Sequence, residues 1–171
     1  MCETLCKLHD KGIHHRDIKP SNIYYYDGRY AFGDFGLVDF PDNDDFTKSD
    51  RGLGAIFTIA PEMKRNPKLA DASKADVFSL AKTLWMFLSG DEKGFDGVYD
   101  YLDQSHSLRY VSRFKEEHLA EIDELLKDAT ENNPDLRPDI YEFTKRLLLW
   151  REIAGDFDKS QNSDWKFLTK Q

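Results

Sequence analysis

Apolar residues recur along this chain at intervals of three and four, the spacing of a helix that packs one face against a core. Polar residues, glycines and prolines separate these stretches and mark where each helix should end. The pattern therefore predicts a mainly helical fold in which each helix contributes its apolar face to the core. Helices are expected over residues 2–11, 73–89, 116–130 and 138–155.

The helix expected over residues 73–89 has the widest apolar stripe, so we expect it to be buried inside the domain. Ser73 and Asp76 form a capping-box-like start, and Gly90 supplies a stop. Pro138 should be the first residue of the last helix, where its missing N–H does no harm. The stripe of the buried helix consists of Val77, Leu80, Ala81, Leu84, Trp85 and Leu88.

A small β-hairpin is expected where two aromatic-rich runs, residues 23–26 and 29–32, flank an Asp-Gly pair. This pair between apolar runs is a strong hairpin signal. A short strand is expected at residues 13–14, and residues 37–59 are expected to form a long loop, since they contain several glycine, proline and aspartate residues. The predicted fold class is therefore mainly α with a small β-hairpin region.

The composition indicates which classes of binding partner this protein is not expected to have. The 171 residues carry a formal net charge of −8, and 33% of them are charged, which is typical of a globular domain. The negative charge argues against a nucleic-acid partner, since phosphate binding needs clustered Lys and Arg. The sequence has no run of 18 apolar residues and no signal-peptide pattern at its start. Cys2 and Cys6 lack further ligands at metal spacing, so we expect reduced thiols and a cytoplasmic protein.

Five short motifs carry the candidate chemistry. The first is HRDIKPSN at residues 15–22, and DFG follows at residues 34–36. APE stands at residues 60–62, DVFSL at residues 76–80 and RP at residues 137–138. Three letters recur by chance, but five motifs in this order, each on a suitable local structure, form a strong signal.

The predicted hairpin lies between the first two motifs and should bring Asn22 and Asp34 together. An amide oxygen and a carboxylate are hard ligands that suit Mg²⁺. Asp17 lies in a loop, where a carboxylate can reach a substrate hydroxyl and accept its proton. Lys19 would point the same way and neutralise charge on a transferring phosphoryl group. The five histidines are scattered, so a histidine-based metal site is not expected.

Together, these motifs resemble those of the protein kinase family. Residues 15–22 fit the catalytic-loop pattern H-R-D-L-x-x-x-N, with Ile18 at the leucine position, and DFG is the metal-binding turn of the family. The resemblance is to the C-terminal lobe and covers residues 1–155, which leaves residues 156–171 as a C-terminal extension. It implies a protein substrate, with ATP and Mg²⁺ or Mn²⁺ as cofactors.

The resemblance also assigns roles to individual residues. It implies that Asp17 is the catalytic base, that Lys19 contacts the phosphate, and that Asn22 and Asp34 hold the nucleotide's metal ions. Lys19 further implies a Ser/Thr acceptor rather than Tyr. The implied function is transfer of the ATP γ-phosphoryl group to a protein Ser/Thr hydroxyl.

Other matching residues are expected to be structural. His15 should brace the catalytic loop by packing, and Glu62 and Arg137 resemble the buried ion pair that ties the activation segment to the lobe. By the same resemblance, Asp76 should accept hydrogen bonds from the backbone of the catalytic loop. A simpler role for Asp76, a carboxylate near the positive end of a helix dipole, fits the sequence equally well.

The residue at the position of Arg16 in this family often binds the phosphate group of a phosphorylated Thr or Ser in the activation segment. Thr47 and Ser49 are the candidate phosphorylation sites in this chain. Alternatively, Asp44 or Asp45 supplies the negative charge permanently, or the acidic run is a solvated loop.

The sequence departs from the family pattern in two ways. Ala55 stands where Ser/Thr kinases usually place a Thr whose hydroxyl bridges the catalytic Asp and Lys. The sequence also contains no G-x-G-x-x-G loop and no V-A-I-K lysine, so the ATP phosphates lack an anchor that the family mechanism requires. We therefore expect a fragment of a longer kinase or a truncated reading frame, with little or no phosphate transfer by these 171 residues alone.

Two other functions stay open. A non-catalytic, kinase-like module could bind a protein partner through its exposed lobe face, although such a module has no need of Asp17, Lys19, Asn22 and Asp34 together. A small-molecule phosphotransferase of related fold is disfavoured by the APE and DVFSL motifs, which belong to the protein-kinase pattern.

Overall fold

The computed structural model describes residues 1–38, 53–115 and 117–154. This part of the chain is mostly helical with one two-stranded antiparallel sheet, so the predicted fold class is confirmed. The helices are α1 (Cys2–His9), α2 (Leu53–Thr58), α3 (Pro61–Arg65), α4 (Ala72–Ser89), α5 (Ala120–Ala129) and α6 (Ile140–Ala154), and the strands are β1 (Ile23–Tyr26) and β2 (Arg29–Phe32).

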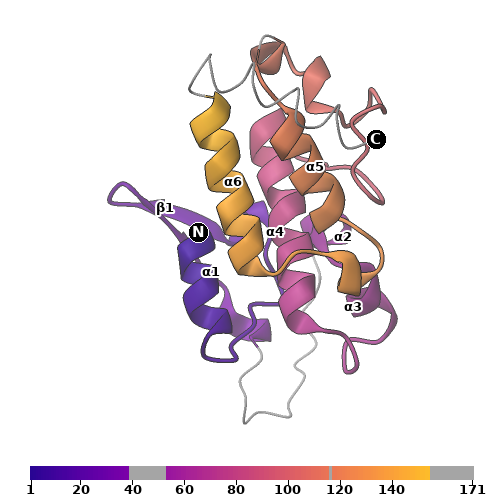
Figure 1. The fold of residues 1–171 in the computed structure, drawn as a ribbon. Coiled ribbons are helices and arrows are strands. Elements are labelled where there is room, and N and C mark those ends of the chain that lie inside the picture. Colours follow the sequence, from indigo (N-terminus) through magenta and orange to yellow (C-terminus); the bar gives the residue numbers. More distant parts are fainter. Residues whose placement is uncertain (39–52, 116, 155–171) are drawn as a thin grey trace.

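Helix α4 is the centre of the fold, as its wide apolar stripe predicts. Figure 1 shows α4 in the middle of the molecule, with α6 to one side and α5 and α2 to the other. Val77, Leu80, Ala81 and Trp85 are at most 2% exposed, and they pack with residues of α1, α5 and α6 in the main core. Helices α2, α3, α5 and α6 all contact this helix.

The start of α4 differs from the prediction. Asp71 is the N-cap residue, and its carboxylate accepts hydrogen bonds from the backbone N–H groups of Ser73 (2.9 Å) and Lys74 (3.1 Å). The proposed capping box of Ser73 with Asp76 is therefore wrong, because Asp71 already accepts both the N–H and the hydroxyl of Ser73. The end agrees with the prediction: Gly90 has a φ of +77° and caps the helix.

The β-hairpin agrees with the prediction residue by residue. Ile23 pairs with Phe32, and Tyr26 pairs with Arg29. The two turn residues, Asp27 and Gly28, have positive φ values of 49° and 74°, as a type I′ turn requires. Phe32 is buried at the base of the hairpin, so the end that leads to the DFG motif is fixed in the core.

Several other elements differ from the prediction, and α1 ends at His9, two residues earlier than expected. Residues 13–14 form only an isolated bridge at His14 rather than a strand. Helix α2 lies inside the expected loop of residues 37–59, and α5 begins at Ala120, four residues later than expected.

Helix α6 begins at Ile140 rather than at Pro138. The carboxylate of Asp139 accepts the N–H of Glu142 at 2.8 Å, and its carbonyl accepts the N–H of Phe143 at 2.9 Å. Asp139 therefore caps the helix and moves its start past the proline. Among the described residues, none of these helices is long and apolar enough to cross a membrane.

Candidate active site

The structure brings Asp17, Lys19 and Asn22 into one hydrogen-bonded cluster. The Lys19 ammonium donates to Asp17 Oδ2 at 2.8 Å, and the side chains of Lys19 and Asp17 are only 14% and 12% exposed. The Asn22 amide donates to the same Oδ2 and to the backbone oxygen of Asp17, both at 2.9 Å. Asn22 itself is 5% exposed. The Asp17 carboxylate is therefore held in one orientation by two neighbours on its own loop.

Asp76, at the start of α4, holds the backbone of this loop in place. Its carboxylate accepts the backbone N–H groups of His15 and Arg16, both at 2.7 Å, and lies 3.0 Å from His9 Nε2. Asp76 is 0% exposed. Arg16 has a φ of +65°, a conformation that costs a non-glycine residue about 1–3 kcal/mol. The charge-assisted hydrogen bonds that the His15 and Arg16 N–H groups donate to Asp76 offset that cost, so Asp76 is more than a helix-terminus charge.

The hairpin connects Asn22 to Asp34. The Gly33 N–H donates to the carbonyl of Asn22 at 2.8 Å, directly before Asp34. Asp34 has a φ of +55°, and its carboxylate accepts the N–H of Gly36 at 3.4 Å. Local hydrogen bonding of this kind is what lets Asp adopt the left-handed conformation. Both predicted metal ligands therefore lie at the same end of the hairpin.

His15 braces this region from inside the core. It is 0% exposed, its Nε2 lies 3.1 Å from the carbonyl oxygen of Gly33, and its ring packs against Phe32 and Phe35 with centroids 5.3 and 5.1 Å away. The imidazole thus links the catalytic loop to both sides of Asp34.

The donor set of this site fits a metal–nucleotide complex rather than a metal ion alone. Because the Asn22 amide nitrogen donates to Asp17, its Oδ1 is the oxygen left for a cation, and Asp34 offers a carboxylate. Among the described residues there is no group of three or more His, Cys, Asp or Glu that could hold a metal. Mg²⁺ usually takes one or two protein oxygens and completes its shell with phosphate oxygens and water, so the two side chains suit magnesium that arrives with ATP.

A buried ion pair fixes the APE motif. The Arg137 guanidinium donates to both oxygens of Glu62, at 2.6 and 2.9 Å, in the bidentate geometry that matches a carboxylate. It also donates to the carbonyls of Glu131 and Lys74 and packs over the Phe78 ring, 4.8 Å from its centroid. Because the Arg137 side chain is 0% exposed, α3 is tied to the body of the domain at this point.

The proposed regulatory residues are only partly described. The Arg16 guanidinium donates to the carbonyl of Pro67 at 3.3 Å. Thr47, Ser49, Asp44 and Asp45 lie outside the described residues.

Two polar residues in this part of the fold were not predicted. His9, in the last turn of α1, contacts Asp76, and no sequence signal distinguishes it from a surface histidine. Lys82 is buried in the middle of α4, and here a signal exists, because it is the one charged residue of the stretch 77–89, which contains the apolar stripe.

Comparison with known proteins identifies the family. The sequence model described as "Protein kinase domain" matches residues 1–151. The chain therefore belongs to the protein kinase domain family.

Its relatives include several Ser/Thr kinases. It is 31% identical over 146 residues to the serine/threonine-protein kinase PDK1 of Cryptococcus neoformans var. grubii, covering 82% of this chain and 12% of that protein. It is 31% identical over 145 residues to the serine/threonine-protein kinase ppk34 of Schizosaccharomyces pombe (83% of this chain, 40% of the relative). Human receptor-interacting serine/threonine-protein kinase 1 is 28% identical over 186 residues, which cover 99% of this chain and 27% of that protein. The chain thus spans less than half the length of each of these three relatives.

Proposed function

We propose that this chain is the C-terminal catalytic lobe of a protein Ser/Thr kinase, which transfers the γ-phosphoryl group of ATP to a protein hydroxyl. The observation that carries the proposal is the cluster of Asp17, Lys19 and Asn22. In this cluster Oδ2 of Asp17 accepts hydrogen bonds from the Lys19 ammonium and from the Asn22 amide. Relatives described as Ser/Thr kinases support the acceptor class.

Asp17 acts as the base that orients the acceptor hydroxyl and takes its proton. Both side-chain donors on its loop bind Oδ2, which leaves Oδ1 to face a substrate hydroxyl. Phosphoryl transfer needs little covalent chemistry from the protein, so a fixed carboxylate and balanced charge are the main contributions required of this loop.

Lys19 and the ligand pair provide the charge balance. The Lys19 ammonium is already held 2.8 Å from Asp17, where it can also neutralise the transferring group. Asn22 Oδ1 and the Asp34 carboxylate would hold the magnesium of Mg·ATP, which supplies the phosphoryl group and offsets its negative charge when bound. The two residues are brought together by the hydrogen bond from Gly33 to Asn22.

The experiment joins this chain, ahead of α1, to the glycine-rich-loop lobe of one of its kinase relatives. This addition restores the anchor for the ATP phosphates that the 171 residues lack. We expect phosphate transfer from ATP to Ser/Thr of a generic protein substrate. Asp17→Asn should lower transfer by at least about 100-fold, the size of a general-base contribution, with Mg·ATP binding retained.

Asp34→Asn is the matched variant for the metal role. It should weaken Mg·ATP binding in calorimetry, whereas Asp17→Asn should not. Transfer that survives Asp17→Asn would contradict the proposed base.

The alternative is a kinase-like module that binds a protein partner without transferring phosphate. A joined protein that folds and binds Mg·ATP, yet transfers no phosphate to any Ser/Thr substrate, would favour this alternative.

A further inference from the structure

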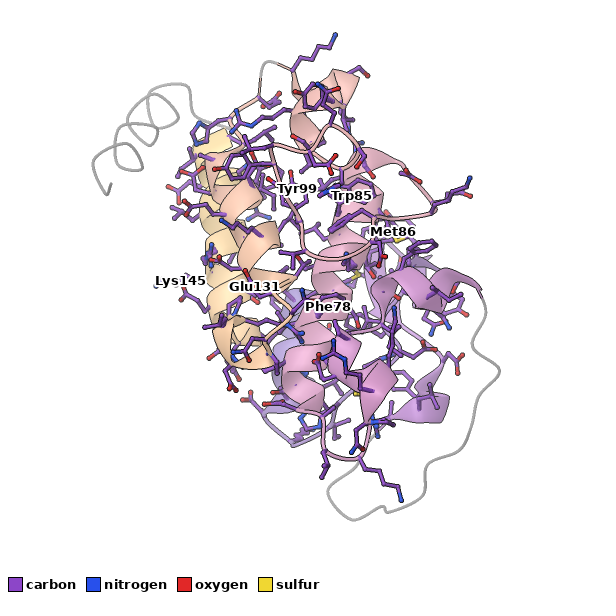
Figure 2. All side chains as sticks on the ribbon, turned by 90° about the vertical axis from the view of Figure 1, so that its right-hand side faces the viewer. Phe78, Trp85, Met86, Tyr99, Glu131 and Lys145 are labelled. Atoms are coloured by element: carbon purple, nitrogen blue, oxygen red, sulfur yellow. The ribbon has the colours of Figure 1, made fainter. Side chains whose placement is uncertain are left out.

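Asp96 and Gly97 form an exposed bend between two buried aromatic side chains. Phe95, directly before the bend, is 6% exposed, and Tyr99, two residues after it, is 1% exposed. Phe95 meets Trp85 of α4 edge-on, and Figure 2 shows Tyr99 near Trp85 toward one end of this helix. Both ends of the bend are therefore held against the core, while the bend itself is open to water.

Lys82 of α4 fixes the backbone on either side of Asp96. Its ammonium donates to the carbonyl of Phe95 at 3.0 Å and to the carbonyl of Gly97. It also lies 3.4 Å from the centroid of the Phe95 ring, where the ring face attracts a cation. Because one ammonium binds the carbonyls of residues 95 and 97, it restricts the conformation of the residue between them.

The side chain of Asp96 lies against the backbone nitrogen of the next residue. The Gly97 N–H donates to Asp96 Oδ1, with nitrogen and oxygen 3.0 Å apart. Because Cγ is bonded to this oxygen, a small rotation of the carboxyl group brings Cγ to the roughly 3–3.5 Å from the nitrogen at which groups react. Gly97 has a φ of +68°, and a Cβ there would meet no atom within 4 Å. Nothing hinders this approach.

We propose that Asp96 and Gly97 are a site of spontaneous backbone modification, at which the aspartate isomerises to isoaspartate through a cyclic succinimide. The Gly97 nitrogen bonds to Cγ of the neutral Asp96 carboxyl and loses its proton, while the carboxyl hydroxyl departs, so that one water is released. Water then opens the ring. Opening at Cγ restores aspartate, whereas opening at the backbone carbon gives isoaspartate. Water is the only other reactant, and the inference does not depend on the proposed kinase activity.

Isoaspartate would change the chain between the two aromatic anchors. It routes the main chain through the side chain of residue 96, which adds one methylene group and leaves a free carboxylate on Cα. The carbonyls of Phe95 and Gly97 can then no longer both keep their places on Lys82. At the neighbouring Gly94, a Cβ would lie 3.1 Å from Phe57 Cβ. Because this backbone packs so closely on α2, the modification should loosen the contact with that helix.

The hairpin turn supplies an internal comparison, because Asp27 and Gly28 are the other Asp-Gly pair of the sequence. Both turn residues have positive φ values, 49° and 74°, and Tyr26 pairs with Arg29 across the turn. Figure 1 shows this hairpin projecting away from the helices. Ring closure would require the turn to leave its conformation. Asp27 should therefore react only when the hairpin opens, and each 1.4 kcal/mol of opening free energy slows the reaction tenfold.

The experiment compares the two sites in the folded and the unfolded chain. The 171-residue chain is incubated at pH 6 in buffer and in guanidinium chloride, and isoaspartate is quantified at each site by mass spectrometry with electron-transfer fragmentation. In denaturant both pairs should react at similar rates. In the folded chain Asp96 should react about as fast as in denaturant, whereas Asp27 should react at least about tenfold more slowly.

Two outcomes of this comparison would overturn the proposal. One is a folded-state rate at Asp96 that lies about tenfold or more below its rate in denaturant, because the structure would then prevent ring closure. The other is an equal change at Asp27 and Asp96 on folding, because the contact with the Gly97 nitrogen would then have no effect.

Asp96→Glu is the matched variant, because glutamate keeps the charge but can close only a six-membered ring, which forms far more slowly. In the unsubstituted chain, the peptide with residues 96 and 97 should include a form lighter by one water, which is the succinimide. This form and isoaspartate should both disappear from that peptide in Asp96→Glu, while the reaction at Asp27 continues. Isoaspartate that persists in the substituted peptide would contradict the assignment to Asp96.

Discussion

Removing the charge of Glu62 should strongly destabilise the domain. The substitution Glu62→Gln keeps the length of the side chain but leaves the Arg137 guanidinium without its carboxylate. The Arg137 side chain is 0% exposed and that of Glu62 is 16% exposed. Loss of one partner of a buried pair costs about 3–5 kcal/mol, because the remaining charge is left uncompensated.

The structure places this substitution at the lower end of that range. The Arg137 guanidinium keeps its hydrogen bonds to the carbonyls of Glu131 (2.6 Å) and Lys74 (3.2 Å), and Glu62 is not completely buried. We therefore expect the free energy of unfolding to fall by about 3 kcal/mol. For a chain of this size the melting temperature should drop by about 6–12 °C.

The assay is urea unfolding at pH 7, followed by circular dichroism, with Lys145→Gln as the control. Lys145 and Glu142 form an ion pair at 3.6 Å with side chains 79% and 48% exposed, and Figure 2 shows Lys145 pointing away from α6 into solvent. Such surface pairs contribute at most about 1 kcal/mol. If Glu62→Gln costs no more than Lys145→Gln, the ion pair does not tie α3 to the domain.

Two further substitutions test the local geometry of the site. Gly33→Ala would place a Cβ 2.4 Å from Tyr24 Cε2, so we expect the Tyr24 ring to move and the free energy of unfolding to fall by about 1 kcal/mol or more. In a Tyr24→Ala background the cost of Gly33→Ala should vanish. Equal costs in the two backgrounds would contradict the contact. Asp71→Ala should lower the free energy of unfolding by about 1 kcal/mol because α4 loses its N-cap, whereas Asp71→Ser should be nearly neutral. Urea unfolding of both variants measures these changes, and an equal loss in both would contradict the capping role.

The sequence predicted best where a structure depends on nearby residues. The hairpin was correct because positive φ at Asp27 and Gly28 is a local property of the turn pair. Gly90 was identified as the end of α4 for the same reason. The contact of Lys19 with Asp17 is also local, because the two residues lie two positions apart in one motif.

Helix starts were predicted less well because several capping residues compete within a few positions. Asp71 precedes Ser73 by two residues and accepts the backbone N–H of Ser73, which the predicted capping box assigned to Asp76. Asp139 follows Pro138 and captures the first turn of α6 in the same way. Only the path of the incoming chain decides between such neighbours, and that path depends on tertiary packing.

Tertiary contacts account for the remaining differences. Helix α2 is only six residues long and contains a glycine, so its own helix propensity is weak, and it forms against α4. The carbonyl partners of Lys82 lie 13 and 15 residues away in sequence. A charged residue at this position of an apolar stripe marks a special site, but the sequence does not specify what the amine binds.

Helix α4 fixes the loop that carries Asp17 through one buried carboxylate. Asp76 accepts the backbone N–H groups of His15 and Arg16 and lies 3.0 Å from His9 Nε2. Regions with fewer independent contacts open at lower free energy than the core. Because Asp76 joins the loop to the central helix and to α1 at the same time, the loop should open only at a free energy close to that of the core.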